Sequence, residues 1–119
     1  MKKVSFRFKL KNKLFNINVK ECISLWSKFS GLMFKNKSPC LLFVFNKNKN
    51  LCIHSFFCKP FIAIWFNSDK EITKILNISE KGINFCGFGK YLLEIPQSDE
   101  NYLKMTKILK LSDGDNAKV

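Results

Sequence analysis

This sequence of 119 residues has little of what usually identifies a function. It contains one Arg (Arg7), one His (His54), three Pro and five Gly. Its longest apolar runs are Leu41–Phe45 and Phe61–Phe66. A helix that crosses a bilayer needs roughly 20 apolar residues, so these runs are too short and no membrane partner is expected.

Motifs for nucleotide binding and hydrolysis are also missing. The chain has no G-x-x-x-x-G-K-[ST], G-x-G-x-x-G, G-x-S-x-G or H-E-x-x-H pattern. The cysteines are odd in number and show no C-x-x-C spacing; they are Cys22, Cys40, Cys52, Cys58 and Cys86. This pattern predicts neither a disulfide framework nor a zinc site. No cofactor or metal is expected.

The cysteine pattern also bears on the compartment. Without a framework, we expect all five thiols to be reduced and mostly buried as small apolar side chains. The N-terminal residues alternate apolar and charged side chains, whereas a signal peptide would continue into an apolar stretch. Both observations favour a cytoplasmic protein.

Charge of one sign is in excess. The net charge is +12, and Lys provides all but one of the 21 cationic side chains. Such a balance is typical of proteins that bind nucleic acid through phosphate neutralisation. However, the lysines are spread along the chain, and the Arg fork that recognises phosphate is almost absent. Weak, non-specific nucleic-acid binding is therefore the alternative function and not the leading one.

Apolar residues are plentiful, at 46% with 13 Phe. A chain of this length can build one hydrophobic core without disulfides, so we predict a single domain over 1–119. Residues 3–20 alternate apolar and polar side chains on both sides of a polar turn at 11–13, which predicts a β-hairpin with one buried face.

The rest of the chain reads mainly as short strands. We expect strands at 40–45, 51–57, 61–66, 71–78 and 91–95, with a turn at 46–50, a glycine-containing loop at 81–89 and a last edge strand in the tail. An amphipathic stripe predicts a helix from Ser24 to Met33, and Ser98 is the expected N-cap of a short helix that ends near Met105. The predicted fold class is mainly β, an antiparallel barrel or sandwich of seven or eight strands with one or two short helices, one of which covers an opening.

Two polar residues inside apolar strands are candidates for chemistry. His54 could form a dyad with Cys58 or Cys52, which share its face of a strand, although a lone His in such a strand is more commonly a hydrogen-bonded structural residue. Glu94 stands among apolar neighbours, and we expect it to face water more readily than to pair with a lysine. Catalysis is therefore less expected than binding.

Five ordered sequence boxes resemble the uncharacterised family called domain of unknown function 192. They are Gly31–Lys35, Leu41–Phe45, the segment Ile53–Phe57 with Pro60 behind it, Tyr91–Glu94, and Gly114 with Asp115. The resemblance implies a small, mostly-β fold, while the function of that family is itself unsettled. Family members often carry Asp two residues after the Pro, where this chain has Ile62.

The leading functional interpretation is a non-catalytic domain that binds a small molecule or peptide in an aromatic groove between 31–34 and 54–60. Sites of this kind are concave and apolar, with few polar groups. The candidate binding residues are Gly31, Met33, Phe34, His54, Phe56, Phe57, Pro60 and Glu94. The competing interpretation is that these aromatic side chains fill the core.

Overall fold

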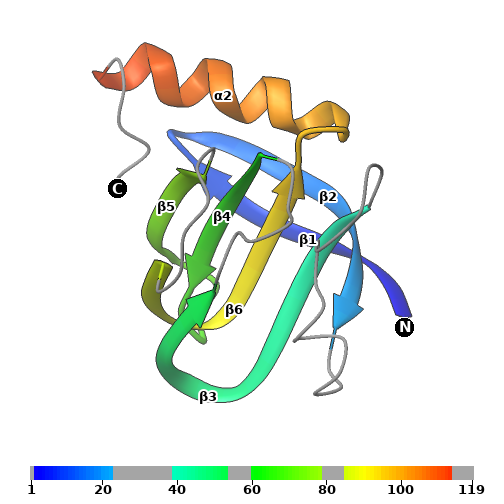
Figure 1. Ribbon diagram of the computed structural model, residues 1–119, viewed down its shortest axis with the longest axis vertical. Helices are drawn as coiled ribbons and strands as arrows, with labels where there is room; N and C mark the ends of the chain where they lie inside the picture. The colour runs from blue at the N-terminus through cyan, green and yellow to red at the C-terminus, as the bar shows by residue number, and fades with distance from the viewer. Residues whose placement is uncertain (1, 23–38, 54–59, 79–84, 114–119) are drawn as a thin grey trace.

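One six-stranded mixed sheet and one helix make up the part of the chain that the computed structural model describes, residues 2–22, 39–53, 60–78 and 85–113 (Figure 1). The elements are β1 (Lys2–Leu10), β2 (Lys13–Cys22), β3 (Cys40–Ile53), β4 (Phe61–Phe66), β5 (Ile72–Ile78), β6 (Phe85–Pro96) and α2 (Glu100–Asp113). The strand order is β1-β2-β3-β6-β4-β5, so β6 lies at the centre and the sheet does not close into a barrel.

The predicted hairpin is confirmed. β1 and β2 pair antiparallel from Lys2 opposite Glu21 to Leu10 opposite Lys13. Lys11 and Asn12 connect them with φ values of 53° and 65°. Positive φ at both central residues is the requirement of a type I′ turn, whose twist matches that of the paired strands.

The mainly β fold class is confirmed, but the described residues form six strands in one mixed sheet and not the seven or eight strands of an antiparallel barrel or sandwich. Residues 46–50, expected as a turn, continue β3, with a shift of register between Val44 and Lys49. Two predicted strands thus merge into one long strand that bends, because a β-bulge can absorb residues of poor strand propensity. β2 and β3 are parallel while the other neighbours are antiparallel, so the sheet is mixed.

Gly87 and Gly89 lie within β6 and not in the predicted loop. A Cβ at Gly87 would come within 2.6 Å of the Trp65 ring, and one at Gly89 would overlap the Phe66 carbonyl. Glycine is needed at both positions because β4 approaches the β6 backbone too closely for a side chain. Both glycines therefore meet a packing requirement within β6 and do not mark a loop.

The core has two apolar layers, one on each face of the central strands. The first core cluster contains Phe6, Phe8 and Ile17 from the hairpin, Ile62, Ile64 and Phe66 from β4, and Met105 and Leu109 from α2, among others. The second core cluster contains Leu41, Phe43, Phe61, Ala63, Trp65 and Leu92 with three further residues. Because strand side chains alternate between faces, β4 sends 62, 64 and 66 to the first cluster and 61, 63 and 65 to the second.

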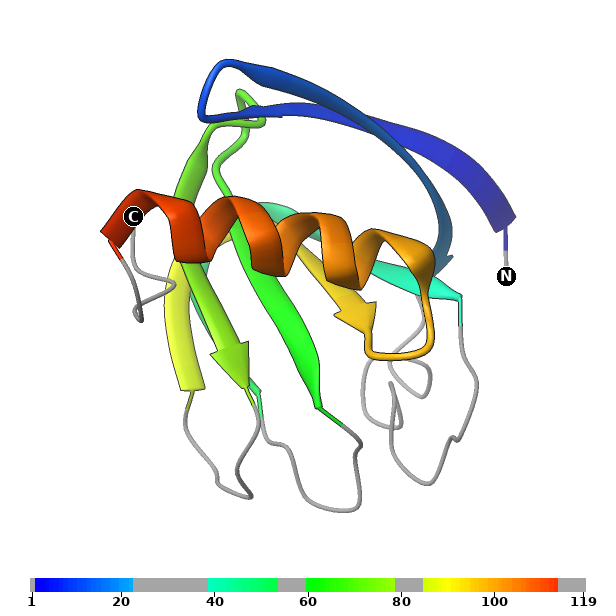
Figure 2. The ribbon, with the colours of Figure 1, turned by 90° about the horizontal axis from the view of Figure 1, so that it is seen from above.

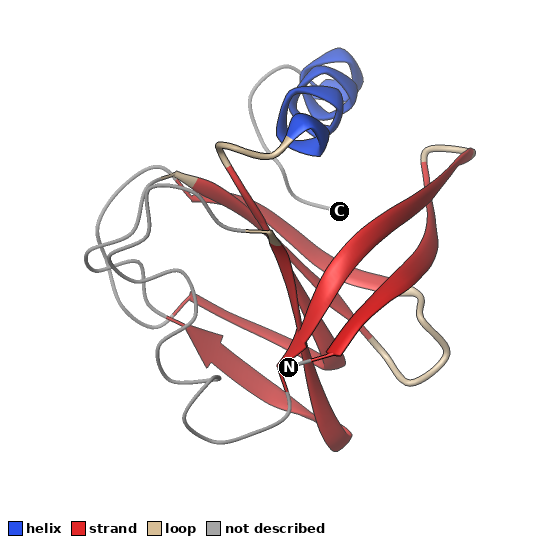
Figure 3. Cartoon of the chain, turned by 90° about the vertical axis from the view of Figure 1, so that its right-hand side faces the viewer, coloured by secondary structure: helices blue, strands red, loops and turns tan. Residues whose placement is uncertain are grey.

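α2 covers the opening between the hairpin and the strands β4 and β6 (Figures 2 and 3). It is longer than predicted, and its N-cap is Asp99 and not Ser98, since Asp99 Oδ1 accepts a hydrogen bond from the Asn101 backbone N–H at 2.8 Å. The helix expected at 24–33 and the edge strand expected in the tail lie outside the described residues. No helix in the described part of the chain is long and apolar enough to cross a membrane.

Candidate functional site

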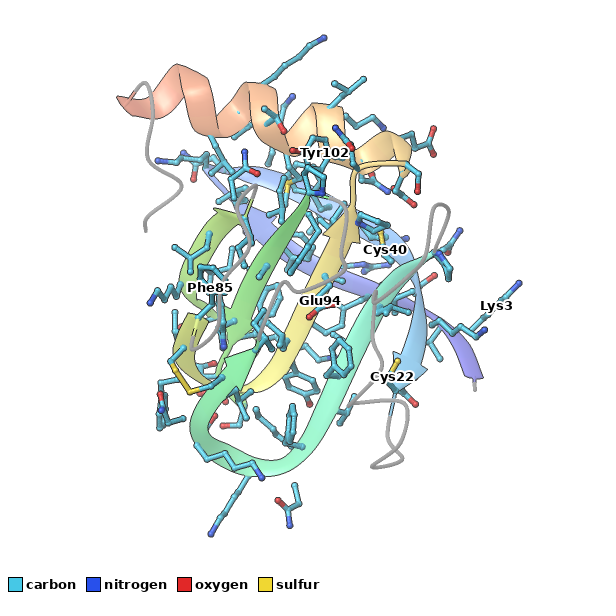
Figure 4. The ribbon with its side chains drawn as sticks, in the orientation of Figure 1. Lys3, Cys22, Cys40, Phe85, Glu94 and Tyr102 are labelled. Atoms are coloured by element: carbon cyan, nitrogen blue, oxygen red, sulfur yellow. A yellow bond between two sulfur atoms is a disulfide. The ribbon has the colours of Figure 1, made fainter. Side chains whose placement is uncertain are left out.

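The site begins with Glu94, a carboxyl group in the middle of the central strand β6 (Figure 4). Its neighbours across the sheet are Leu41 on β3 and Ala63 on β4. Its side chain is 5% exposed, and among the described residues it is the one buried polar or charged side chain. The strand alternation puts it on the face of Leu92, in the layer of the second core cluster.

Burial raises the pKa of Glu94 from 4.5 to about 8. Desolvation is the cause, because removing a carboxylate from water without a compensating partner disfavours its charged form. The expectation that Glu94 faces water is therefore wrong. Among the described residues, no lysine stabilises its charged form. At neutral pH the group is mostly a neutral carboxylic acid, which can donate a hydrogen bond to an acceptor.

Trp65 anchors the same layer from β4. Its indole N–H donates to the Leu51 carbonyl oxygen at 3.0 Å, and its ring lies over Gly87. The Lys74 ammonium donates to the Cys86 carbonyl oxygen at 2.6 Å and lies 5.8 Å from the centroid of the Trp65 ring. Trp65 carries no signal in the sequence that separates it from core residues, because it lies within an apolar run and its partners come from distant strands.

A disulfide joins Cys52 on β3 to Cys86 on β6, with an S–S distance of 2.08 Å. The prediction of five reduced thiols is therefore wrong. The two cysteines are 34 residues apart but lie directly opposite each other in the β3–β6 register, and that pairing could not be read from their spacing. The cytoplasmic prediction rested partly on reduced thiols and loses that support.

Most of the predicted aromatic groove lies outside the described residues. This applies to Gly31, Met33, Phe34, His54, Phe56 and Phe57, and to Cys58 of the alternative dyad. The dyad of His54 with Cys52 is wrong, because Cys52 is oxidised in the disulfide and has no thiol to offer. Of the predicted site residues, Pro60 is described as half-buried beside β4 and Glu94 as buried on β6.

Ile62, the position at which the sequence resemblance leads one to expect Asp, is fully buried in the first core cluster. It pairs with Ile95 and faces away from Glu94, because Ile62 and Ala63 point to opposite sides of β4. An Asp at this position would therefore lie in the apolar layer beneath α2 and not beside Glu94. The described residues also contain no group of three His, Cys, Asp or Glu side chains able to hold a metal ion.

Comparisons with known proteins show the fold and nothing finer. No protein-family model and no curated protein matches the chain. One similar structure is a protein from Sinorhizobium meliloti 1021 that is provisionally described as a transcription regulator, with a TM-score of 0.67, 14% identity and coverage of 94% of this chain and 86% of that one. Another is a protein of unknown function from Novosphingobium aromaticivorans DSM 12444, with a TM-score of 0.71, 14% identity and coverage of 96% and 83%. This chain therefore shares the fold of both proteins.

Proposed function

We propose that the protein binds a small molecule or peptide at the β6 face that carries Glu94, without catalysing a reaction. The observation that supports this most directly is the burial of one carboxyl group in an otherwise apolar layer. A buried polar group without a partner destabilises a fold, so a purely structural layer is better served by an apolar residue. A role in ligand binding would explain why a carboxyl group is present at this buried position.

The neighbours of Glu94 favour a ligand that is mostly apolar with one polar group. Leu41, Ala63 and Leu92 surround the carboxyl group with hydrocarbon, and Ala63 contributes the smallest side chain directly opposite it. Ligand sites commonly combine such an apolar lining with a single well-placed polar group that fixes orientation. The ligand group facing Glu94 is a hydrogen-bond acceptor for its proton, such as a carbonyl oxygen.

Fragment binding followed by ¹H–¹⁵N NMR tests this proposal. The probes are benzamide, acetophenone and toluene, which share one ring and differ in the polar group. We expect the two polar probes to shift the amide signals of Leu41, Ala63 and Leu93–Ile95, and toluene to shift them less. Glu94→Leu should remove that difference, whereas Glu100→Gln, which neutralises an exposed carboxyl group, should preserve it. Equal shifts with all three probes, or no shift at these residues, would refute the proposal.

We also propose that the chain is a member of the domain of unknown function 192 family. The box Leu41–Phe45 lies in β3 and the box Tyr91–Glu94 in β6, and their residues pair in register, with Leu41 opposite Glu94 and Val44 opposite Tyr91. Boxes far apart in sequence thus meet around the proposed site. A profile built from homologues of this chain should match the family at all five boxes, and a profile that aligns none of them would contradict membership.

A further inference from the structure

The outward face of the β1–β2 hairpin gathers cationic side chains that are separated in the sequence. The inward side chains of the hairpin, such as Phe6 and Ile17, fill the first core cluster, so the alternate residues point outward. The outward residues with a charge or a polar group are Lys3, Ser5, Arg7, Lys9, Asn16, Asn18 and Lys20, all exposed except the half-buried Lys20. The turn adds Lys11 and Asn12 at the tip.

The pairing register sets one pair of like charges on this face and leaves its other cations without an acidic neighbour across the hairpin. Lys3 lies opposite Lys20, and Arg7 and Lys9 lie opposite Asn16 and Leu14, with no acidic residue among these outward pairs. Like charges directly opposite each other destabilise a sheet. An anionic partner would relieve this repulsion. The placement of the cations on one face therefore favours an anionic partner, which the net charge of the whole chain does not show by itself.

Both ends of the hairpin open into hollows that continue the basic face. Near the tip, a cleft of about 580 Å³ lies between β2 and α2. Its lining contains three lysines and two asparagines beside three apolar residues, and no acidic residue of the described chain: Lys13, Lys104, Lys107, Asn16, Asn101, Leu14, Phe15 and Ile108. At the other end, a pocket of about 430 Å³ is lined by Lys3 and Lys20 together with the single acid Asp99. The two hollows mark the ends of one basic surface, and the lysines of α2 widen it.

We propose that this surface, the outward face of the β1–β2 hairpin with Lys104 and Lys107 of α2, binds duplex DNA. A nine-residue strand extends over roughly 30 Å, and a two-stranded ribbon fits the major groove of B-form DNA. Ser5, Asn16 and Asn18 supply hydrogen-bonding groups between the cations. A membrane is the poorer partner, since the outward face carries one exposed large apolar side chain, Leu14, and a membrane surface would require several. This proposal is independent of the Glu94 site, which lies on β6.

The test compares two variants that lose the same charge. Arg7→Gln with Lys9→Gln removes two outward cations of β1, and Lys47→Gln with Lys49→Gln removes two cations at the bend of β3, at the bottom of Figure 1. Binding is measured by fluorescence anisotropy with a DNA duplex of about 20 base pairs, at salt concentrations from about 50 to about 200 mM. Circular dichroism and thermal unfolding check that both variants fold as the parent does.

We expect the hairpin variant to bind about tenfold more weakly and to lower the slope of log affinity against log salt by about two, because each lost phosphate contact removes about one. The bend variant should stay within about twofold of the parent. Equal losses in both variants would overturn the proposal, since they would show a response to net charge and not to this surface. So would absence of binding to the duplex at the lowest salt concentration, or tighter binding to a duplex RNA of the same sequence or to phosphatidylserine vesicles.

Discussion

The two faces of the central strands are equally buried and differ in one group. On the first face, all the buried side chains of the described residues are apolar, and the hairpin and α2 cover them. On the second face, Glu94 lies among Leu41, Ala63 and Leu92, and Trp65 uses its polar N–H to hold a backbone carbonyl. Apolar content therefore does not separate the two layers, and the buried carboxyl group is the feature on which the proposed binding site rests.

The largest expected difference between the faces is a pH dependence that comes from Glu94. Burial raises its pKa from the ordinary 4.5 to about 8, so the folded state keeps a proton that the unfolded state releases. Stability from this group is greatest below pH 4.5 and falls as the pH rises toward 8, by up to about 5 kcal/mol in the free energy of unfolding.

Urea unfolding between pH 4.5 and 9 measures this effect. The difference in unfolding free energy between the parent and Glu94→Gln should change steadily over that range, with the variant relatively more stable at high pH. Glu100→Gln at an exposed position serves as the control and should follow the parent. Parallel curves for the parent and Glu94→Gln would mean that the carboxyl group is solvated.

Phe66→Ala should disrupt the packing of the first core cluster. The Phe66 ring is fully buried, with its centroid 5.0 Å from that of Phe6 and 5.1 Å from that of Phe8. We expect a loss of about 3–5 kcal/mol in the free energy of unfolding, because the cavity would open between the hairpin and β4. Phe88→Ala is the matched control: that side chain is 53% exposed and should cost under about 1 kcal/mol. Comparable losses in the two variants would contradict the assignment of Phe66 to the sealed layer.

Removing the Cys52–Cys86 disulfide should weaken the β3–β6 pairing next to Trp65. The bond links positions 34 residues apart, and disulfides closing loops of this order stabilise proteins by about 2–4 kcal/mol. Cys52→Ser with Cys86→Ser should lose that amount in urea unfolding. Intact mass after alkylation without reductant should show Cys52 and Cys86 unmodified in the oxidised protein, and alkylation of all five cysteines would disprove the bond.

A smaller effect is expected from Gly87→Ala, which places a methyl group against the Trp65 ring. Overpacking of this kind costs about 1–3 kcal/mol, and the Trp65 fluorescence should shift as the ring moves. Combining the change with Trp65→Phe should cost less than the sum of the two single changes, because the smaller ring leaves room for the methyl group. Strict additivity would show that Gly87 and Trp65 do not contact each other.

The sequence alone determined the elements whose pattern is local. The alternation in residues 3–20 predicted the hairpin and its buried face, and the apolar runs at 40–45 and 61–66 predicted strands. These predictions hold because the period of two is set by the strand backbone itself. Between the predicted strands 61–66 and 71–78 the chain turns, and the Asn67 side chain accepts hydrogen bonds from the Asp69 and Glu71 backbone N–H groups.

Tertiary structure decided everything that depends on which strands become neighbours. The alignment of β3 with β6 brings Cys52 opposite Cys86, and the position of β6 between β3 and β4 buries Glu94, although its local sequence allows a solvent-facing strand. Folding also turns dispersed lysines into one basic hairpin face. The physical reason is the same in each case: burial, disulfide pairing and surface charge depend on contacts between residues distant in sequence, and the periodicity of a single segment carries no information about its neighbours.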